Sequence, residues 1–215
     1  MAQIVPAILT NDPNIYKQKM ELFHPFAKRI HVDITDGTFA PSKTIPPTNV
    51  WWPQGTAVDL HMMVARPSEH LQVIMQLKPS LCIFHAEAGE DLVSIMKQLK
   101  NAGIKAGVAL MKTSFPGDYK QFIEIADHVL IFAGDLGKQG GTADMLQTEK
   151  IPLVKAINPN CEIGWDGGAN IKTVRAIAKA GADVICAGAA ISNAPDPKAA
   201  FDQLTADLDK RGVVL

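Results

Sequence analysis

The sequence predicts an α/β protein, specifically a single TIM (β/α)8 barrel, and two observations lead to this class. Short, nearly continuous apolar runs alternate with amphipathic segments along the 215 residues. Such runs are typical of parallel strands that are buried on both faces. Eight runs in 215 residues give about 27 residues per unit, close to the length of a strand-plus-helix repeat. Eight such units close a barrel, whereas an open doubly wound sheet usually stops at five or six strands.

The expected strands are short and dominated by apolar residues. No linker-like or low-complexity stretch separates them, so we expect one domain over residues 1–215. In chain order, the strands are expected at Ile4–Leu9, Arg29–Ile34, Ala57–Val64, Leu81–Ala86, Ala106–Met111, His128–Ala133, Glu162–Trp165 and Asp183–Ala187.

The segments between the strands show helical patterns. Asp12 is a candidate N-cap, and Pro13 would then occupy the first helical position. Towards the C-terminus, two segments place apolar residues on one helix face, and the first of them ends at Gly181. These residues are Ile171, Val174, Ile177 and Ala178 in the first segment, and Phe201, Leu204 and Leu208 in the second.

Composition and charge exclude several classes of protein. The formal net charge is −1, from 21 basic and 22 acidic residues without charge blocks, so neither a nucleic-acid footprint nor a polybasic membrane patch is expected. Cys82, Cys161 and Cys186 lie in apolar runs and are predicted to be buried thiols in a reducing compartment. The N-terminus lacks a signal-peptide pattern, and no apolar run is long enough to span a membrane. We therefore expect a cytoplasmic protein.

Four polar side chains fall at the carboxyl ends of expected strands, where TIM barrels carry their catalytic groups. They are His31, Asp33, His61 and Asp166. His31 and Asp33 are two residues apart, so both side chains point to the same face of their strand. Two imidazoles and two carboxylates can bind a divalent cation, and carboxylates can also transfer protons. The pattern therefore indicates a metal-assisted proton-transfer enzyme.

Other residues share these strand ends, and each alone has a structural explanation. For His85 we favour a hydrogen-bonded core histidine over a ligand. A structural explanation is weak for the set of four, because each buried polar group without a partner would cost about 1–3 kcal/mol. The remaining residues at strand ends are Thr10, Glu87, Met111 and Gly188.

Glycines gather in the last three loops that follow strands. In TIM barrels these loops often present backbone N–H groups to a phosphate, and glycine lets the backbone approach closely. Tight turns also require glycine, so only the repetition at three strand ends favours phosphate binding. Lys138 could screen the phosphate or simply be a solvated loop lysine. The loops are GDLGKQGGTAD, DGGAN and AGAAIS.

Taken in order, the motifs resemble those of the ribulose-phosphate 3-epimerase family. The resemblance covers essentially the whole chain, and its His-x-Asp, His and Asp-Gly-Gly set is not shared by phosphate-binding barrels in general. It implies a TIM barrel of the ribulose-phosphate-binding type. The segments that carry it are HVDITDGTFAPS, DLHMMV, FHAEA, GVALMKTS, WDGGAN and GADVICAGAAISNAPDP.

The resemblance implies a metal-dependent 3-epimerase that interconverts D-ribulose 5-phosphate and D-xylulose 5-phosphate. Asp33 and Asp166 correspond to the acid and base that act on opposite faces of an enediolate. His31, Asp33, His61 and Asp166 correspond to the ligands of one divalent ion, expected to be zinc, iron, manganese or cobalt. Substrate and phosphate contacts are expected from Thr10, His61, Gly137, Gly140, Gly141, Gly167, Gly168, Gly188 and Ala189.

The chain departs from the family around the expected substrate. Thr35 and Phe132 stand where the family has methionines that cap the reacting carbon. The loop GDLGKQGG is one residue longer than its counterpart and lacks the proline. The other replacements are Met111 and Lys112 for Asn-Pro, Thr10 for serine, and Ala189 for serine. The metal and base set is thus intact, while the residues expected to face the substrate differ from those of the family.

Two alternatives remain open. The chain could be an epimerase of a longer ketose phosphate such as allulose 6-phosphate, or a non-catalytic sugar-phosphate-binding barrel. Retention of both aspartates argues against the second. An orotidine-decarboxylase type of site is not indicated, since the early strands lack an Asp-x-Lys-x-x-Asp set. The expected partners are a small-molecule ketose phosphate and further copies of the chain in a homo-oligomer, with neither nucleic acid nor a membrane.

Overall fold

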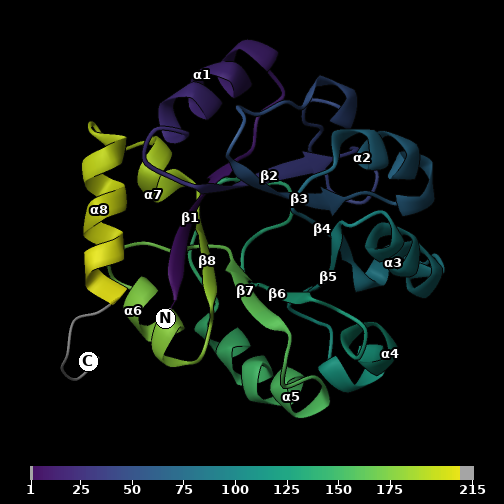
Figure 1. Cartoon of the computed structure of the whole chain (residues 1–215). Helices are drawn as coiled ribbons and strands as arrows, with labels where there is room; N and C mark the ends of the chain where they lie inside the picture. The colour runs from purple at the N-terminus through teal and green to yellow at the C-terminus, as the bar shows by residue number, and fades with distance from the viewer. Residues whose placement is uncertain (1, 209–215) are drawn as a thin grey trace.

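The strands form one closed parallel barrel. The computed structural model describes residues 2–208, in which each strand pairs with the next in chain order and β8 closes on β1 (Figure 1). Every expected strand is present within one residue of its expected bounds, so the predicted fold class is confirmed. The strands are β1 (Gln3–Ile8), β2 (Arg29–Thr35), β3 (Ala57–Met63), β4 (Leu81–His85), β5 (Lys105–Leu110), β6 (His128–Phe132), β7 (Glu162–Asp166) and β8 (Val184–Ala187).

Helices surround the barrel on the outside (Figure 1). Within the described residues, no helix combines the length and apolar character needed to cross a lipid bilayer. The α-helices are α1 (Pro13–Phe23), α2 (Leu71–Leu77), α3 (Leu92–Asn101), α4 (Lys120–Ile123), α5 (Lys150–Ile157), α6 (Val174–Lys179), α7 (Ala189–Ser192) and α8 (Pro197–Leu208). Short 3-10 helices are η1 (Pro47–Asn49), η2 (Pro67–His70), η3 (Ala86–Ala88), η4 (Pro116–Tyr119) and η5 (Met145–Glu149).

Helix α1 begins where the sequence predicts. The Asp12 carboxylate accepts the backbone N–H of Asn14 at 2.7 Å, and Pro13 follows as the first helical residue. In α8, Leu204 is buried, while Phe201 and Leu208 are half-buried and pack against the core. Both helices therefore present the apolar residues expected of amphipathic helices.

Helix α6 differs from the prediction at its start. Val174 and Ile177 are buried as expected, but Ile171 precedes the helix and is 41% exposed. The reason is a local turn: the Asn170 side chain accepts the N–H of Lys172, so this segment is held as a turn before the helix begins. The assignment of Ile171 to the buried face was therefore wrong.

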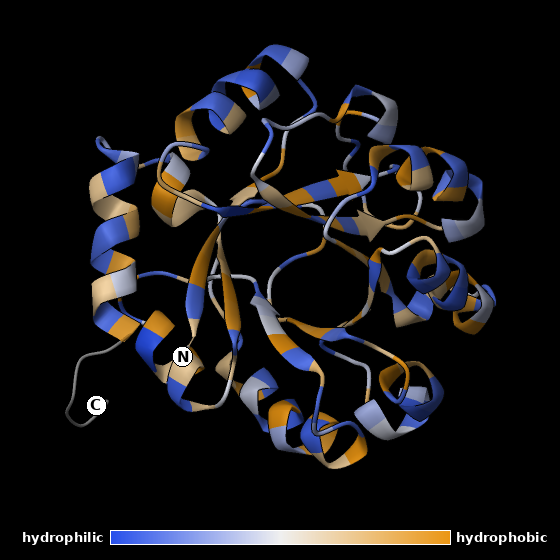
Figure 2. Cartoon of the chain, in the orientation of Figure 1, coloured by the Kyte–Doolittle hydropathy of each residue, from blue (hydrophilic) through white to orange (hydrophobic). Residues whose placement is uncertain are grey.

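The hydrophobic core fills the space between strands and helices. Figure 2 shows helices that alternate between hydrophobic and hydrophilic residues around strands with many apolar positions. The largest fully buried side chain is Trp165 on β7. Cys82, Cys161 and Cys186 are buried and free, as predicted.

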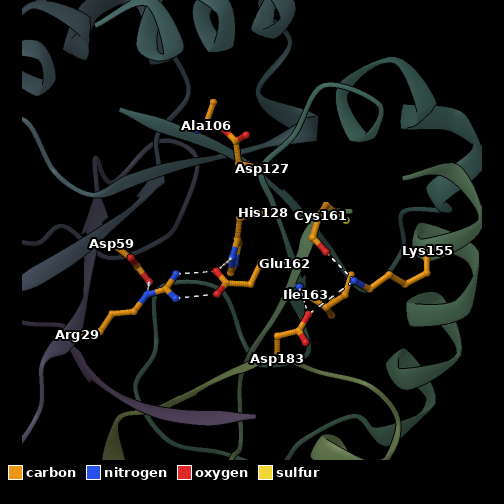
Figure 3. A network of polar contacts seen from close by, with 10 residues as sticks. All are labelled: Arg29, Asp59, Ala106, Asp127, His128, Lys155, Cys161, Glu162, Ile163 and Asp183. Atoms are coloured by element: carbon orange, nitrogen blue, oxygen red, sulfur yellow. Dashed lines mark hydrogen bonds and ion pairs between the residues drawn. The ribbon is translucent and has the colours of Figure 1, made fainter. Parts of the chain in front are cut away.

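A network of charged side chains lies at the amino ends of the strands. The Arg29 guanidinium bonds both oxygens of Glu162 at 2.9 and 2.8 Å, and its Nε donates to Asp59 at 2.7 Å (Figure 3). His128 Nδ1 lies 2.8 Å from Glu162. Burial raises the pKa of Glu162, but His128 and Arg29 outweigh it and hold that pKa well below its ordinary value. These contacts join β2, β3, β6 and β7 at the base of the barrel.

Candidate active site and metal centre

The structure brings together the polar residues that the sequence places at strand ends. One ligand atom from each of four side chains lies within 4.8 Å of the others. The residues are His31 and Asp33 from β2, His61 from β3 and Asp166 from β7. All lie at the carboxyl half of the barrel, because alternate residues of a strand share one face and the parallel register sets Asp33 beside His61.

Asp33 lies at the centre of this cluster. Its Oδ1 is 2.9 Å from Nδ1 of His61 and 3.2 Å from Nε2 of His31. His61 Nδ1 is also 3.6 Å from Oδ2 of Asp166. Both imidazoles are fully buried, so these groups interact with little screening by water.

The two carboxylates have opposite tendencies to hold a proton. Burial raises the pKa of Asp33, but His31 and His61 outweigh it, so the pKa lies below its ordinary value. For Asp166, burial and the neighbouring Asp33 charge both act upwards, and the pKa is raised. Burial lowers the pKa of His31, yet Cys186 and Asp33 together bring it well above its ordinary value.

The donor set fits a divalent metal ion. Both ring nitrogens of His31 are buried and without a hydrogen bond. Within residues 2–208, the ion pairs of Asp33 and Asp166 are made with histidines. Two imidazole nitrogens and two carboxylate oxygens suit zinc, iron, manganese or cobalt. A cation at this point would give the His31 nitrogen a partner and compensate both carboxylates.

A line of buried polar groups supports His61 from behind. His61 Nε2 lies 2.9 Å from Nε2 of His85, and His85 Nδ1 lies 3.4 Å from Oε2 of Glu87. Glu87 Oε1 accepts the N–H of Met111 at 3.0 Å and the hydroxyl of Ser114. His85 is thus the buried, hydrogen-bonded histidine that we expected, but its partner is a residue of the candidate metal site.

This line is consistent with one arrangement of protons. If His61 Nδ1 faces the metal site unprotonated, its Nε2 carries the proton and donates to His85 Nε2. His85 then carries its proton on Nδ1, facing Glu87. Burial and the proximity of His61 lower the pKa of His85 to about 4 against the opposing effect of Glu87, which keeps the ring neutral. In this arrangement Glu87 would be the acceptor at the end of the line, 3.4 Å from His85 Nδ1.

A cavity of about 290 Å³ opens beside the cluster. Asp33 and Asp166 line it, together with residues of the loops that follow β6, β7 and β8. Every glycine expected to bind phosphate is in this lining. Those residues, with Ala189, are Gly137, Gly140, Gly141, Gly167, Gly168 and Gly188.

Glycine is required where the loops after β6 and β7 meet. Gly167 has φ of +118°, and a Cβ there would lie 2.1 Å from the backbone nitrogen of Gly134. Gly168 has φ of +65°, and its Cβ would lie 2.0 Å from the nitrogen of Ala143. No other residue fits this close approach of two backbones.

Two expected substrate residues, and one expected cap residue, lie outside the lining. The Thr10 hydroxyl accepts the N–H of Asp12 at 3.2 Å, at the start of α1. His61 is covered by its neighbours. Thr35 is buried, with its hydroxyl 3.4 Å from that of Ser42, which in turn donates to the carbonyl of Gly137 at 2.7 Å. Thr35 therefore supports the loop after β6.

Phe132, the other expected cap residue, does line the cavity, and the centroid of its ring lies 6.1 Å from that of His61 and 5.6 Å from that of His85. Several other residues of the lining were not predicted from the sequence. Met63, Gln139 and Asn170 also line the cavity. Met63 could have been found from its place at the end of β3, whereas Gln139 and Asn170 lie within loops whose path the sequence does not reveal.

The barrel and the placement of its site define the class of protein, a TIM-barrel enzyme. Solved structures of other enzymes share the fold. 3-Hexulose-6-phosphate synthase from Salmonella typhimurium matches with a TM-score of 0.65 at 15% identity, covering 96% of this chain and 98% of that one. Orotidine 5'-phosphate decarboxylase from Pyrococcus horikoshii matches with a TM-score of 0.66 at 17% identity, covering 97% and 100%. At these identities the likeness extends to the fold alone.

Sequence comparison identifies the family. Residues 3–192 match the model described as the Ribulose-phosphate 3 epimerase family. A ribulose-phosphate 3-epimerase from Schizosaccharomyces pombe is 30% identical over 204 residues, covering 92% of this chain and 90% of the relative. One from Helicobacter pylori is 29% identical over 209 residues, covering 94% and 96%. The chain belongs to the ribulose-phosphate 3-epimerase family, whose members are carbohydrate isomerases.

Proposed function

We propose that the protein is a metal-dependent 3-epimerase that interconverts D-ribulose 5-phosphate and D-xylulose 5-phosphate. One observation carries the proposal: Asp33 and Asp166, from the non-adjacent strands β2 and β7, line the same cavity beside a histidine cluster. Inversion at a carbon requires a proton to leave from one side and another to arrive from the other. Two carboxylates from separate strands meet this requirement, which a simple binding protein does not have.

His31, Asp33, His61 and Asp166 would hold the metal ion, expected to be zinc, iron, manganese or cobalt. When bound, the ion would act as a Lewis acid that stabilises negative charge developing on the substrate oxygens. His85 and Glu87 hold the His61 ring in the orientation that this role needs.

The two aspartates would transfer the protons. The carboxylate of one aspartate would accept the C3 proton from one side, and the carboxyl group of the other would supply a proton from the opposite side. In the reverse direction the roles exchange. Phe132 and Met63, which line the cavity, would keep water away from the reacting carbon.

The phosphate would lie in the glycine-rich part of the cavity. We propose that backbone groups of the loops after β6, β7 and β8 bind it, since small residues there leave the N–H groups accessible. The residues are Gly137, Gly140, Gly141, Gly167, Gly168, Gly188 and Ala189. Thr10 and His61 are not part of the cavity lining, so a substrate that contacts them would have to extend beyond this cavity.

Phe132 favours a second substrate class. It replaces a family methionine and lines the cavity, so six-carbon ketose phosphates such as allulose 6-phosphate are also candidates. A homo-oligomeric state and a cytoplasmic location complete the proposal, and a relative from Oryza sativa is named a cytoplasmic isoform.

Solvent exchange tests the proposal directly. The metal-loaded protein is incubated with D-ribulose 5-phosphate in D₂O and followed by NMR. We expect deuterium at C3 together with formation of the xylulose epimer. If a panel of five- and six-carbon ketose phosphates shows no exchange while metal is bound, the protein is a non-catalytic sugar-phosphate-binding barrel.

A further inference from the structure

A lysine outside the loops is bonded to a residue of the cavity lining, Gln139. Lys19 Nζ, from α1, donates to Oε1 of Gln139 in the loop after β6 at 3.2 Å. Lys19 is half-buried; burial lowers the pKa of its ammonium, with Asp33 acting in the opposite direction. A partly dehydrated cation is thus bonded to a neutral amide, a weaker partner than an anion.

The Gln139 amide lies directly on the turn after β8. Its Nε2 donates to the carbonyl of Ala7 at 3.2 Å. A Cβ added to Gly188 would lie 2.6 Å from that same Nε2. Gln139, Gly188 and Ala189 all line the cavity. The amide therefore lies against a turn that is proposed to bind phosphate, and its oxygen accepts the hydrogen bond from the Lys19 ammonium.

We propose that Lys19 is the cation of the phosphate subsite, and that the Gln139 amide holds the position taken by a phosphate oxygen when substrate binds. This inference rests on the proposed function, which supplies the anion. Exchange of the amide for phosphate replaces a hydrogen bond between the Lys19 cation and a neutral oxygen by one between opposite charges, which is stronger. The displaced Gln139 amide lies at the cavity edge, where water can solvate it.

Other lysines near the cavity serve as comparisons. Lys17 lies on the same helix, is exposed and pairs with Glu21 at 3.9 Å. Lys138 is exposed and lines the cavity. Lys112 pairs with Asp135 at 3.2 Å. Lys138 thus lines the cavity, whereas Lys19 is half-buried and becomes available to an anion when the Gln139 amide is displaced.

Binding of inorganic phosphate, measured by calorimetry on the metal-loaded protein, tests the assignment without turnover. Lys19→Met should weaken phosphate binding by about tenfold or more, because it removes one charge-assisted hydrogen bond. Lys17→Met, the matched control, should bind like the parent, and Lys138→Met should lose less than Lys19→Met. Gln139→Ala should bind phosphate as well as the parent or more tightly. With ketose phosphate, Lys19→Met should raise KM with little change in kcat.

The outcomes separate the two proposals. If Lys19→Met and Lys19→Gln both bind phosphate like Lys17→Met, Lys19 is not part of the subsite. If Gln139→Ala weakens binding as much as Lys19→Met, Gln139 is a ligand and does not hold the phosphate position. If the parent protein binds no phosphate but does bind metal, the proposed function fails first, and this inference fails with it.

Discussion

The two ends of the barrel carry polar clusters built largely from the same strands, yet they differ in how their charge is compensated. β2, β3 and β7 each contribute to both clusters, which lie two to four residues apart along each strand. The base cluster is Arg29, Asp59, His128 and Glu162. The site cluster is His31, Asp33, His61 and Asp166.

At the base, the compensating charge is a fixed part of the chain. The Arg29 guanidinium neutralises Asp59 and Glu162 and does not release its proton at any ordinary pH. In the site cluster, the carboxylates face imidazoles, a kind of side chain that is charged only while it holds a second proton. Protons can be exchanged for a metal ion, whereas an arginine cannot leave. The comparison therefore separates a structural cluster from a functional one of similar composition.

The largest expected effect is loss of catalysis at the site end. Asp33→Asn and Asp166→Asn should each lower the epimerisation rate by about 10²–10⁴-fold or more, because each removes a proton-transfer group and weakens a metal ligand. The fold should survive, as judged by circular dichroism. If each aspartate serves one epimer, residual solvent exchange should depend on which epimer is supplied. An Asp166→Asn protein with near-normal turnover in both directions would contradict the two-base assignment.

Loss of the Arg29 ion pairs at the base of the barrel should lower the stability of the fold. Arg29→Met leaves the buried Asp59 and the partly exposed Glu162 without their shared cation and should lower the free energy of unfolding by up to about 3–5 kcal/mol. Chemical denaturation measures this change. Metal affinity of the folded protein should stay near that of the parent, because Arg29 bonds to Asp59 and Glu162, neither of which is a candidate ligand. A variant that keeps its stability but loses its metal would show that the two ends are not separate.

Substitution of His85 or Glu87, the buried residues behind His61, should have a smaller effect, on metal affinity. Glu87→Gln and His85→Gln should each weaken metal binding by about 10–100-fold, because the His61 ring loses its fixed orientation. Competition with a chelator provides the affinity, and the absorption spectrum of the cobalt-substituted protein reports the ligand geometry. Ser114→Ala, which removes one of two donors to Glu87, is the matched control and should change less. Equal affinities for all three variants and the parent would remove His85 and Glu87 from the metal site.

The smallest expected effect concerns substrate choice. Phe132→Met restores the family residue in the cavity lining and should raise the preference for ribulose 5-phosphate over six-carbon ketose phosphates by a few-fold. Relative kcat/KM values across a substrate panel measure it. Thr35→Val should leave the preference unchanged, since Thr35 lies outside the lining. If Thr35→Val changes the preference and Phe132→Met does not, the selective contact lies at Thr35.

The parts predictable from sequence are those set by local periodicity. Apolar runs predicted the strands, and the alternation of side chains along β2 predicted that His31 and Asp33 point to the same face of the strand. Contacts between distant segments were not predictable. The pairing of Arg29 with Glu162 spans 133 residues, and that of Lys19 with Gln139 spans 120. A charged residue at a strand start or on a helix carries no sign of such a partner.

His85 shows a different limit. Its sequence position is equally compatible with a core histidine and with a support for the site, and the structure shows both, because its hydrogen-bond partner is His61. Only the distance between two imidazoles on neighbouring strands distinguishes a histidine that merely fills the core from one that orients a candidate ligand.

Metal content tests the central contrast between the two ends most directly. Elemental analysis of the purified protein should find about one divalent ion per chain. Treatment with a chelator should remove it together with the epimerase activity, and the variant Asp33→Asn should hold less metal while Arg29→Met holds as much as the parent. A protein without metal whose activity survives chelators would contradict the account.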